Sequence, residues 1–128
     1  MIDDLKEIGN QIHEEVTQNV AELKTKLQLV EAKGYILMAK MCVAVDHNYD
    51  EATVELNGAG IELDKAKAYA SQKTKGKIEE LRSSVKEVKE HVEDKSDQAL
   101  DKLADLLEKS RKAIDSLGKE EKKSTGKK

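Results

Sequence analysis

The 128-residue sequence contains no proline, phenylalanine or tryptophan, and only three tyrosines. Proline is the strongest helix breaker, so only glycine and turn-forming side chains remain to end a helix in this chain. Large aromatic side chains normally supply much of the volume of a globular core. Their absence favours narrow seams of leucine, valine and alanine between long helices over a thick, compact core.

Other absences narrow the class of protein. No run approaches the roughly 18 apolar residues of a membrane span, and the acidic start Met1–Asp4 lacks the basic and apolar regions of a signal peptide. We therefore expect a cytoplasmic protein, with a removed leader or anchor as the open alternative. Cys42 is the one cysteine, which excludes a disulfide within the chain. The net charge of −3 and the lack of a basic face disfavour nucleic acid as a partner.

Charged residues make up 38% of the sequence, and apolar residues recur every three or four positions. This pattern is typical of long helices and coiled coils. We predict an all-α fold, an elongated antiparallel helical hairpin or three-helix bundle with coiled-coil-like packing, in one domain over residues 1–118. A disordered, lysine-rich tail is expected over 119–128, because Gly118 is a suitable helix stop. Helices are expected over residues 2–46, 49–71 and 77–117.

The first predicted helix carries one apolar stripe along its whole length, in steps of three and four residues. Such spacing keeps one face of a helix apolar. We interpret this face as the seam that the helix buries against the rest of the bundle. The stripe comprises Leu5, Ile8, Ile12, Val16, Val20, Leu23, Leu27, Val30, Gly34, Leu37, Met41 and Val45.

Two breaks are predicted between the helices. The segment Asp46–Asp50 is rich in asparagine and aspartate, which favour turns and helix caps, and it predicts a tight hairpin. The polar segment Ser71–Gly76 predicts a second break or sharp bend. The alternative is one helix over 50–117, about 100 Å long at 1.5 Å per residue. The extra four-residue step from Val92 to Ser96 is interpreted as a stutter within a continuous last helix.

The second predicted helix has a seam of small residues that includes Ala52 and Ala59. We expect Gly58 and Gly60 to help its backbone approach the first helix closely. Residues 36–64 resemble one tetratricopeptide repeat, through Tyr49-Asp50-Glu51-Ala52 followed by Leu56 and Ala59 in the second helix. Lys40 departs from that family's pattern, and no 34-residue period recurs in the chain. The resemblance implies a helical hairpin and makes protein binding an expected function.

No constellation of residues predicts chemistry. The histidines His13, His47 and His91 are far apart, and no pair of cysteines or His-x-x-x-His spacing exists for zinc. Cys42 lies in an apolar stretch, where cysteine acts as a small hydrophobic residue. We expect no catalytic, cofactor or metal site, and no enzyme.

The expected function is a non-enzymatic protein-interaction module: a scaffold, adaptor or chaperone-like bundle that binds a protein partner or self-assembles as a homo-oligomer. The alternative is a peripheral membrane or stress-protective protein acting through amphipathic helices. An acidic column at four-residue spacing predicts a docking stripe for a basic partner, with a solvated face as its alternative. It comprises Glu93, Asp97, Asp101 and Asp105. The candidate partner-binding residues are Val85, Val88, Val92, Leu103 and Leu106 in an unpaired seam, with Tyr35 and Tyr49 at the hairpin tip.

Overall fold

A computed structural model describes the backbone of residues 2–126 and the side chains of residues 19–117. Within this range the chain forms four helices and no strand, which confirms the all-α prediction. The helices are α1 (Ile2–Ala44), α2 (Tyr49–Tyr69), α3 (Gln72–Glu93) and α4 (Ala99–Gly126).

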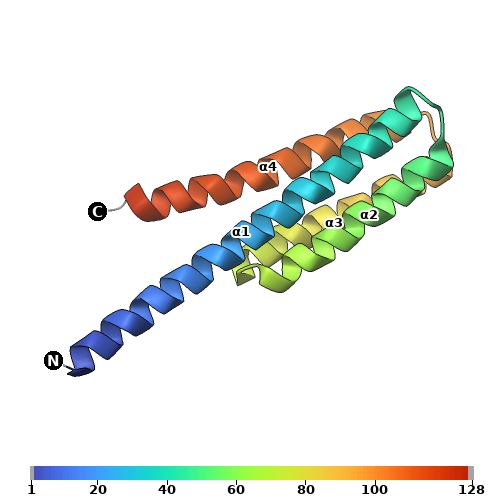
Figure 1. Ribbon diagram of the computed structural model, residues 1–128. Helices are drawn as coiled ribbons and strands as arrows, with labels where there is room; N and C mark the ends of the chain where they lie inside the picture. Colours follow the sequence, from blue (N-terminus) through green and yellow to red (C-terminus); the bar gives the residue numbers. More distant parts are fainter. Residues whose placement is uncertain (1, 127–128) are drawn as a thin grey trace.

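Successive helices run in opposite directions and pack side by side (Figure 1). Contacts join α1 to α2, α2 to α3, and α3 to α4, and a further contact between α4 and α1 closes the ring. The helix α1 has 43 residues, about twice the 21 of α2, so its N-terminal part runs on beyond the end of α2 (Figure 1). The expected three-helix bundle is therefore a four-helix bundle, while coiled-coil-like packing stays a prediction.

The first turn has the chemistry that the sequence predicted. Asn48 caps α2, and its side-chain oxygen accepts a hydrogen bond of 3.0 Å from the backbone N–H of Glu51. Asp50 and Glu51 lie in the first turn of α2, where their negative charges interact favourably with the positive end of the helix dipole. His47 has a φ of 52°, which reverses the chain within a short turn. The predicted hairpin between the first two helices is confirmed.

The second break falls at the start of the predicted segment. The helix α2 ends at Tyr69, and Ser71 caps α3 by accepting a 3.3 Å hydrogen bond from the backbone N–H of Thr74. Gly76 lies inside α3 and stops nothing. The alternative of one continuous helix over 50–117 is wrong, because the serine cap begins a new helix that folds back onto α2.

The third turn corrects the prediction of one helix over 77–117. The backbone N–H of Ser96 donates to the carbonyl of His91, and that of Lys95 donates to the carbonyl of Val92, both at 3.0 Å. This pair of bonds is the Schellman motif, which usually ends a helix at a left-handed glycine. Here Lys95 takes the left-handed conformation, with a φ of 52°. The stutter at Val92–Ser96 is thus a helix end without the expected glycine.

The core is built on alternating large and small residues. On α1, Ala32 and Ala39 are separated by the larger Ile36, and all three are fully buried. On α2, alanines recur every seven residues, so the two backbones approach closely along one line. The buried apolar residues are Leu29, Ala32, Ile36, Ala39, Val43, Ala52, Leu56, Ala59, Leu63, Ala66, Ile78, Leu81, Val85, Val88, Val92, Ala99, Leu103 and Leu106.

The apolar stripe of α1 was predicted to be buried against the bundle, but its described members face outwards. Leu27, inside the stripe, is 54% exposed, whereas Leu29 is 1% exposed. The two positions are about 200° apart around a helix with 3.6 residues per turn. The face with the alanines is buried because it matches the alanines of α2, and the bulkier stripe is left outside. The stripe members before residue 19 lie outside the described side chains.

Two glycines of α2 make room for neighbouring side chains. Gly58 borders α1, as predicted, whereas the same prediction for Gly60 is wrong, because Gly60 faces α3. A Cβ on Gly58 would lie 2.8 Å from ring atoms of Tyr35 on α1, and one on Gly60 would lie 2.7 Å from the guanidinium of Arg82 on α3. The guanidinium of Arg82 also pairs with Asp64 at 3.3 Å. Each glycine therefore supports one of the two interfaces of α2.

The backbone of α4 continues through Gly118 to Gly126. The predicted disordered tail over 119–128 is not confirmed, because most of that segment is helical. Glutamate and lysine, which are good helix formers, follow Gly118, and no proline stops the helix. Lys127 and Lys128 lie outside the described residues.

A leucine-to-alanine substitution is expected to affect the stability of the protein strongly on one face of α1 and hardly at all on the other. Leu29→Ala removes a buried side chain and is expected to lower the free energy of unfolding by about 2–5 kcal/mol. Leu27→Ala removes an exposed one and is expected to change it by less than about 0.5 kcal/mol. Urea denaturation of dilute protein measures both. Equal losses would show that Leu27 is also part of the core.

Substituting alanine for two of the glycines gives a second pair of contrasting predictions. Gly76→Ala is expected to stabilise the protein by up to about 1 kcal/mol, because its added methyl group meets open space and alanine favours helix. Gly58→Ala is expected to destabilise it by about 1 kcal/mol or more, because the methyl group overlaps the ring of Tyr35. In a Tyr35→Ala background, thermal denaturation should show that Gly58→Ala no longer destabilises. A loss that persists there would exclude the ring as its cause.

Candidate interaction surface

The five apolar residues predicted as an unpaired seam are not at the surface. Val85, Val88 and Val92 of α3 and Leu103 and Leu106 of α4 are all buried in the core. The prediction of an open seam is wrong because the turn at 94–98 folds α4 back against α3. Each helix thereby covers the apolar face of the other.

The two tyrosines predicted at the hairpin tip, Tyr35 and Tyr49, are half-buried and pack against the core. The ring of Tyr35 lies over Gly58, two turns from the end of α1. Both rings therefore brace the α1–α2 hairpin. Their partly open edges are what remains of the predicted tip surface.

The predicted acidic column does not lie on one helix. Glu93 is the last residue of α3, Asp97 lies in the turn, and Asp101 and Asp105 lie on α4. All four are exposed, and Glu93 pairs with Lys89 at 3.7 Å. The four-residue spacing holds only within a continuous helix, so the break at residues 94–98 divides the column.

The structure instead leaves an apolar surface on the α1–α2 hairpin. All of the exposed large apolar side chains among the described residues lie on α1, α2 or the turn between them, except Leu100. Val54, Gly58 and Ile61 share one side of α2, and Gly58 contacts α1, so this side borders α1. We name this surface the outer face. It comprises Val20, Leu23, Leu27, Val30, Leu37, Met38, Met41 and Val45 with Val54 and Ile61.

Charged and aromatic groups border the outer face. Lys26, Lys33 and Lys40 recur every seven residues on the flank of α1 that faces α4, where the charge of Lys33 helps to lower the pKa of Glu108. On the flank that faces α2, the amino group of Lys24 lies 5.0 Å from the centre of the Tyr69 ring. That distance is typical of a cation–π contact. The apolar strip thus has a basic row along one edge.

A pair of carboxylates lies where α1 meets α2. Glu62 is only 7% exposed, and its Oε1 accepts a hydrogen bond of 3.3 Å from Lys65. The hydrogen bond with Glu62 raises the pKa of Glu31, burial and the charge of Glu62 act in the same direction, and Lys65 opposes them. With its amide oriented to donate, Gln28 reaches both carboxylates, at 3.1 Å for Glu31. The closeness of the two carboxylates therefore disfavours the charged form of Glu31.

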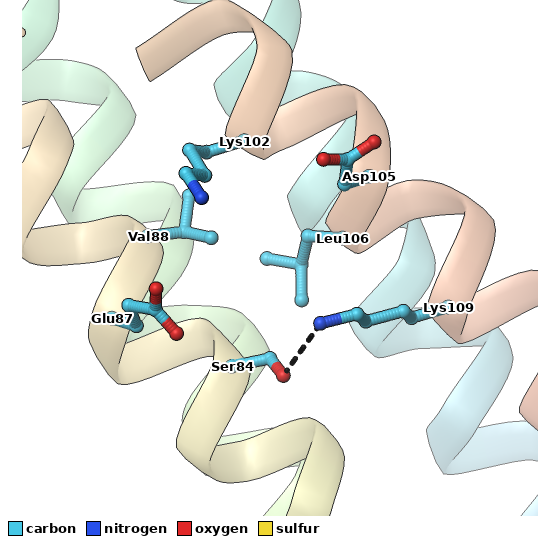
Figure 2. Close-up of a pocket in the computed structure, with 7 residues that line it drawn as sticks. All are labelled: Ser84, Glu87, Val88, Lys102, Asp105, Leu106 and Lys109. Atoms are coloured by element: carbon cyan, nitrogen blue, oxygen red, sulfur yellow. Dashed lines mark hydrogen bonds between the residues drawn. The ribbon is translucent and has the colours of Figure 1, made fainter. Parts of the chain in front are cut away.

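A depression lined by polar side chains together with Val88 and Leu106 lies between α3 and α4 (Figure 2). Lys109 donates a hydrogen bond of 3.4 Å to the hydroxyl of Ser84, and Glu87, Lys102 and Asp105 line the rest of the rim. Opposite charges are balanced around it. Ligand pockets usually hold about 300–1,000 Å³, whereas the volume of this depression is about 50 Å³, so it is a poor candidate.

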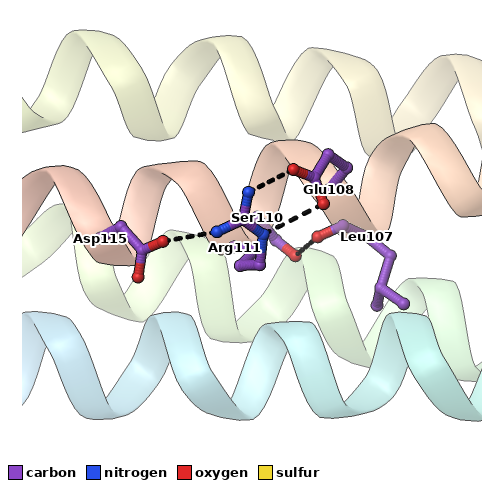
Figure 3. A network of polar contacts seen from close by, with 5 residues as sticks. All are labelled: Leu107, Glu108, Ser110, Arg111 and Asp115. Atoms are coloured by element: carbon purple, nitrogen blue, oxygen red, sulfur yellow. Dashed lines mark hydrogen bonds and ion pairs between the residues drawn. The ribbon is translucent and has the colours of Figure 1, made fainter.

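The exposed side of α4 is held by local ion pairs (Figure 3). Arg111 pairs with Glu108 through two nitrogens and donates to Oδ2 of Asp115 at 2.7 Å. The hydrogen bond from Arg111 lowers the pKa of Glu108. The buried hydroxyl of Ser110 donates to the carbonyl of Leu107 at 2.7 Å, so it is satisfied within the helix. This network stabilises one helix and presents no reactive group.

No other cluster of described residues offers chemistry. Burial raises the pKa of the half-buried Cys42 thiol, and the nearby Glu51, Glu55 and Asp46 act in the same direction, which keeps the thiol protonated and weakly nucleophilic. Among the described side chains, no three metal-ligating groups gather into a candidate metal site. None of the described helices is long and apolar enough to cross a membrane.

Comparison of the chain with family models, curated proteins and solved structures finds no match. The candidate surface therefore depends on the geometry alone. Sequence reasoning found the α1 stripe but assigned it to the core, and it missed Val54 and Ile61 on α2. Their seven-residue spacing, off the line of the alanine seam, was the signal that marks a second face.

The carboxylate pair predicts a pH-dependent effect of Glu31→Gln. The pKa of Glu31 is raised in the folded state, so the folded protein binds a proton at Glu31 more tightly than the unfolded chain does. The stability that this proton contributes is fully present below the unfolded pKa near 4.5, and it is lost as pH rises through the folded pKa. The variant should therefore melt at a higher temperature than the parent at pH 7. The difference should shrink towards pH 4, as thermal denaturation across that range would show. Glu80→Gln, at an exposed position on α3, is the control and should show no such trend.

Proposed function

We propose that this protein is a non-enzymatic interaction module that binds a protein partner through the outer face of its α1–α2 hairpin. The supporting observation is the asymmetry of the bundle. Among the described residues, α3 and α4 bury or half-bury all of their large apolar side chains except Leu100, whereas α1 carries a second apolar face that is left open. Soluble monomers rarely expose a continuous apolar patch larger than about 300–600 Å².

The energetics favour a helical partner. The side chains of the outer face are between 43% and 68% exposed, and covering one fully exposed side chain of this size contributes about 1.5–3 kcal/mol. The part of the outer face on α1 is a straight strip along that helix, with residues mostly in steps of three and four. A second helix laid along such a strip covers all of it, because both present ridges of the same spacing.

A membrane surface is the second candidate for what covers the outer face. Lys26, Lys33 and Lys40 run beside the apolar strip, and helices that lie on membranes also carry lysine beside their apolar face. The helix that would insert is α1, since the apolar face of α3 and α4 is inside the bundle. Such helices usually anchor through tryptophan or phenylalanine, and the chain has neither. This absence favours a protein partner.

A photo-reactive residue tests the proposal. Benzoylphenylalanine in place of Leu27, on the outer face, is expected to form a covalent adduct with protein in a lysate of the producing cells. The same group in place of Ser83, exposed on α3, is expected to form none. The adduct should disappear when excess unmodified chain competes, and when Leu23 and Leu37 are both replaced by glutamine.

The outcomes separate the candidates. Adducts of equal yield from both positions, or no protein adduct from Leu27, would contradict the proposal. Flotation of the purified chain with anionic phospholipid vesicles, lost in the Leu23→Gln/Leu37→Gln variant, would establish the membrane surface as the occupant instead.

A further inference from the structure

Six of the eight apolar positions that the outer face has on α1 and the turn after it are arranged symmetrically about one residue. Gly34 lies near the middle of the described strip, and apolar residues recur at equal distances on either side of it. Val30 and Met38 lie four residues away, Leu27 and Met41 seven, and Leu23 and Val45 eleven. Reversing the direction of the helix about Gly34 therefore places these six apolar positions onto one another, while Leu37 falls on Glu31 and Val20 on Asn48.

We propose that the partner of the outer face is a second copy of this chain, with the two α1 helices antiparallel about a two-fold axis at Gly34. This inference rests on the proposed function and names its partner. A two-fold interface must be complementary to itself, so that each residue pair occurs twice. The symmetry about Gly34 meets this condition, because Leu27 faces Met41 of the second copy, and Met41 faces Leu27 of the second copy.

Gly34 is suited to the centre of such an interface. It is exposed, and a Cβ placed on it would meet nothing within 4 Å in its own chain. The distance between two packed helices depends on the side chains at the point of contact, and it is shortest where these are small. A glycine therefore lets two α1 backbones approach closely. A shallow crossing of about 20° keeps the residues on both sides in contact along the strip.

The size of the surface also fits a dimer. Ten apolar side chains, each about half exposed, present on the order of 800 Å², which is what one partner contributes to a standard interface. The partner must also present a long helix, because the described strip runs from Val20 to Val45, which is longer than either α2 or α3. A second α1 has the required length and the same ridges.

The charges at the edge give the dimer a distinctive salt dependence. In the antiparallel arrangement the row Lys26, Lys33 and Lys40 approaches its own copy. Lys33 is partly offset by Glu108 of its own chain, and the remaining repulsion is between solvated groups that salt screens. The dimer should therefore tighten as salt is added. A complex with an acidic protein bound along this row would weaken instead.

Sedimentation velocity on the purified full chain tests the inference. We expect a monomer–dimer equilibrium that shifts towards dimer with added salt. Leu27→Gln/Met41→Gln is expected to weaken dimerisation at least about 100-fold, because four apolar side chains, which form two contacts across the interface, are lost per dimer. Leu100→Gln, the exposed apolar residue outside the face, is the matched control and should leave the equilibrium unchanged. Circular dichroism of dilute samples checks that every variant is folded.

Disulfide cross-linking tests the orientation. In a Cys42→Ser background, a mixture of the Leu27→Cys and Met41→Cys chains should form a mixed disulfide, and neither chain alone should form one. Cross-linking of each chain with itself would mean parallel helices and would overturn the two-fold axis at Gly34. A chain that stays monomeric at high concentration would overturn the second copy as partner. In that case a Leu27 photo-adduct with a different protein would still support the proposed function.

Discussion

The close approach of α1 and α2 along their alanines is the interaction on which the rest of the structure depends. Ala32 and Ala39 meet a helix whose own seam has alanine at every seventh position, and Gly58 lets the ring of Tyr35 lie flat beside them. Only one side of α1 can pack against α2 in this way. Once the small residues are buried, the larger residues of α1 must lie outside, and the outer face is a direct result of that choice.

Much of the fold could be predicted from the sequence, because its signals were local. Asn48 and the acidic residues after it form a recognisable cap, and the polar segment from Ser71 marked a real break. The third turn could not be predicted, because Lys95 occupies a left-handed position where glycine is expected. Nothing in the local sequence signals that conformation. It is accompanied by the two backbone hydrogen bonds from Lys95 and Ser96 to the end of α3.

The candidate surface was harder to predict for a different reason. Periodicity identifies the apolar positions of a helix, but α1 has apolar positions on two opposite faces. The stripe that includes Leu27 is bulkier and longer, and it was assigned to the core for that reason. The face with Ile36 and Ala39 was chosen by its fit to α2, and that fit depends on a match between two helices that neither sequence segment contains alone. The same error placed the partner surface on Val85 and Leu106, which are buried.

The ring of helix contacts has a consequence for the order of folding. In the described part of the chain, three of the four helix pairs in contact are neighbours in sequence, joined by short turns. Such local contacts cost little loop-closure entropy and form early. The contact between α1 and α4 is the exception, since it joins the two ends of the bundle across three turns and two helices, and its loop-closure cost is the largest. The hairpin of α1 and α2, which carries the outer face, can therefore assemble before α4 returns to complete the ring.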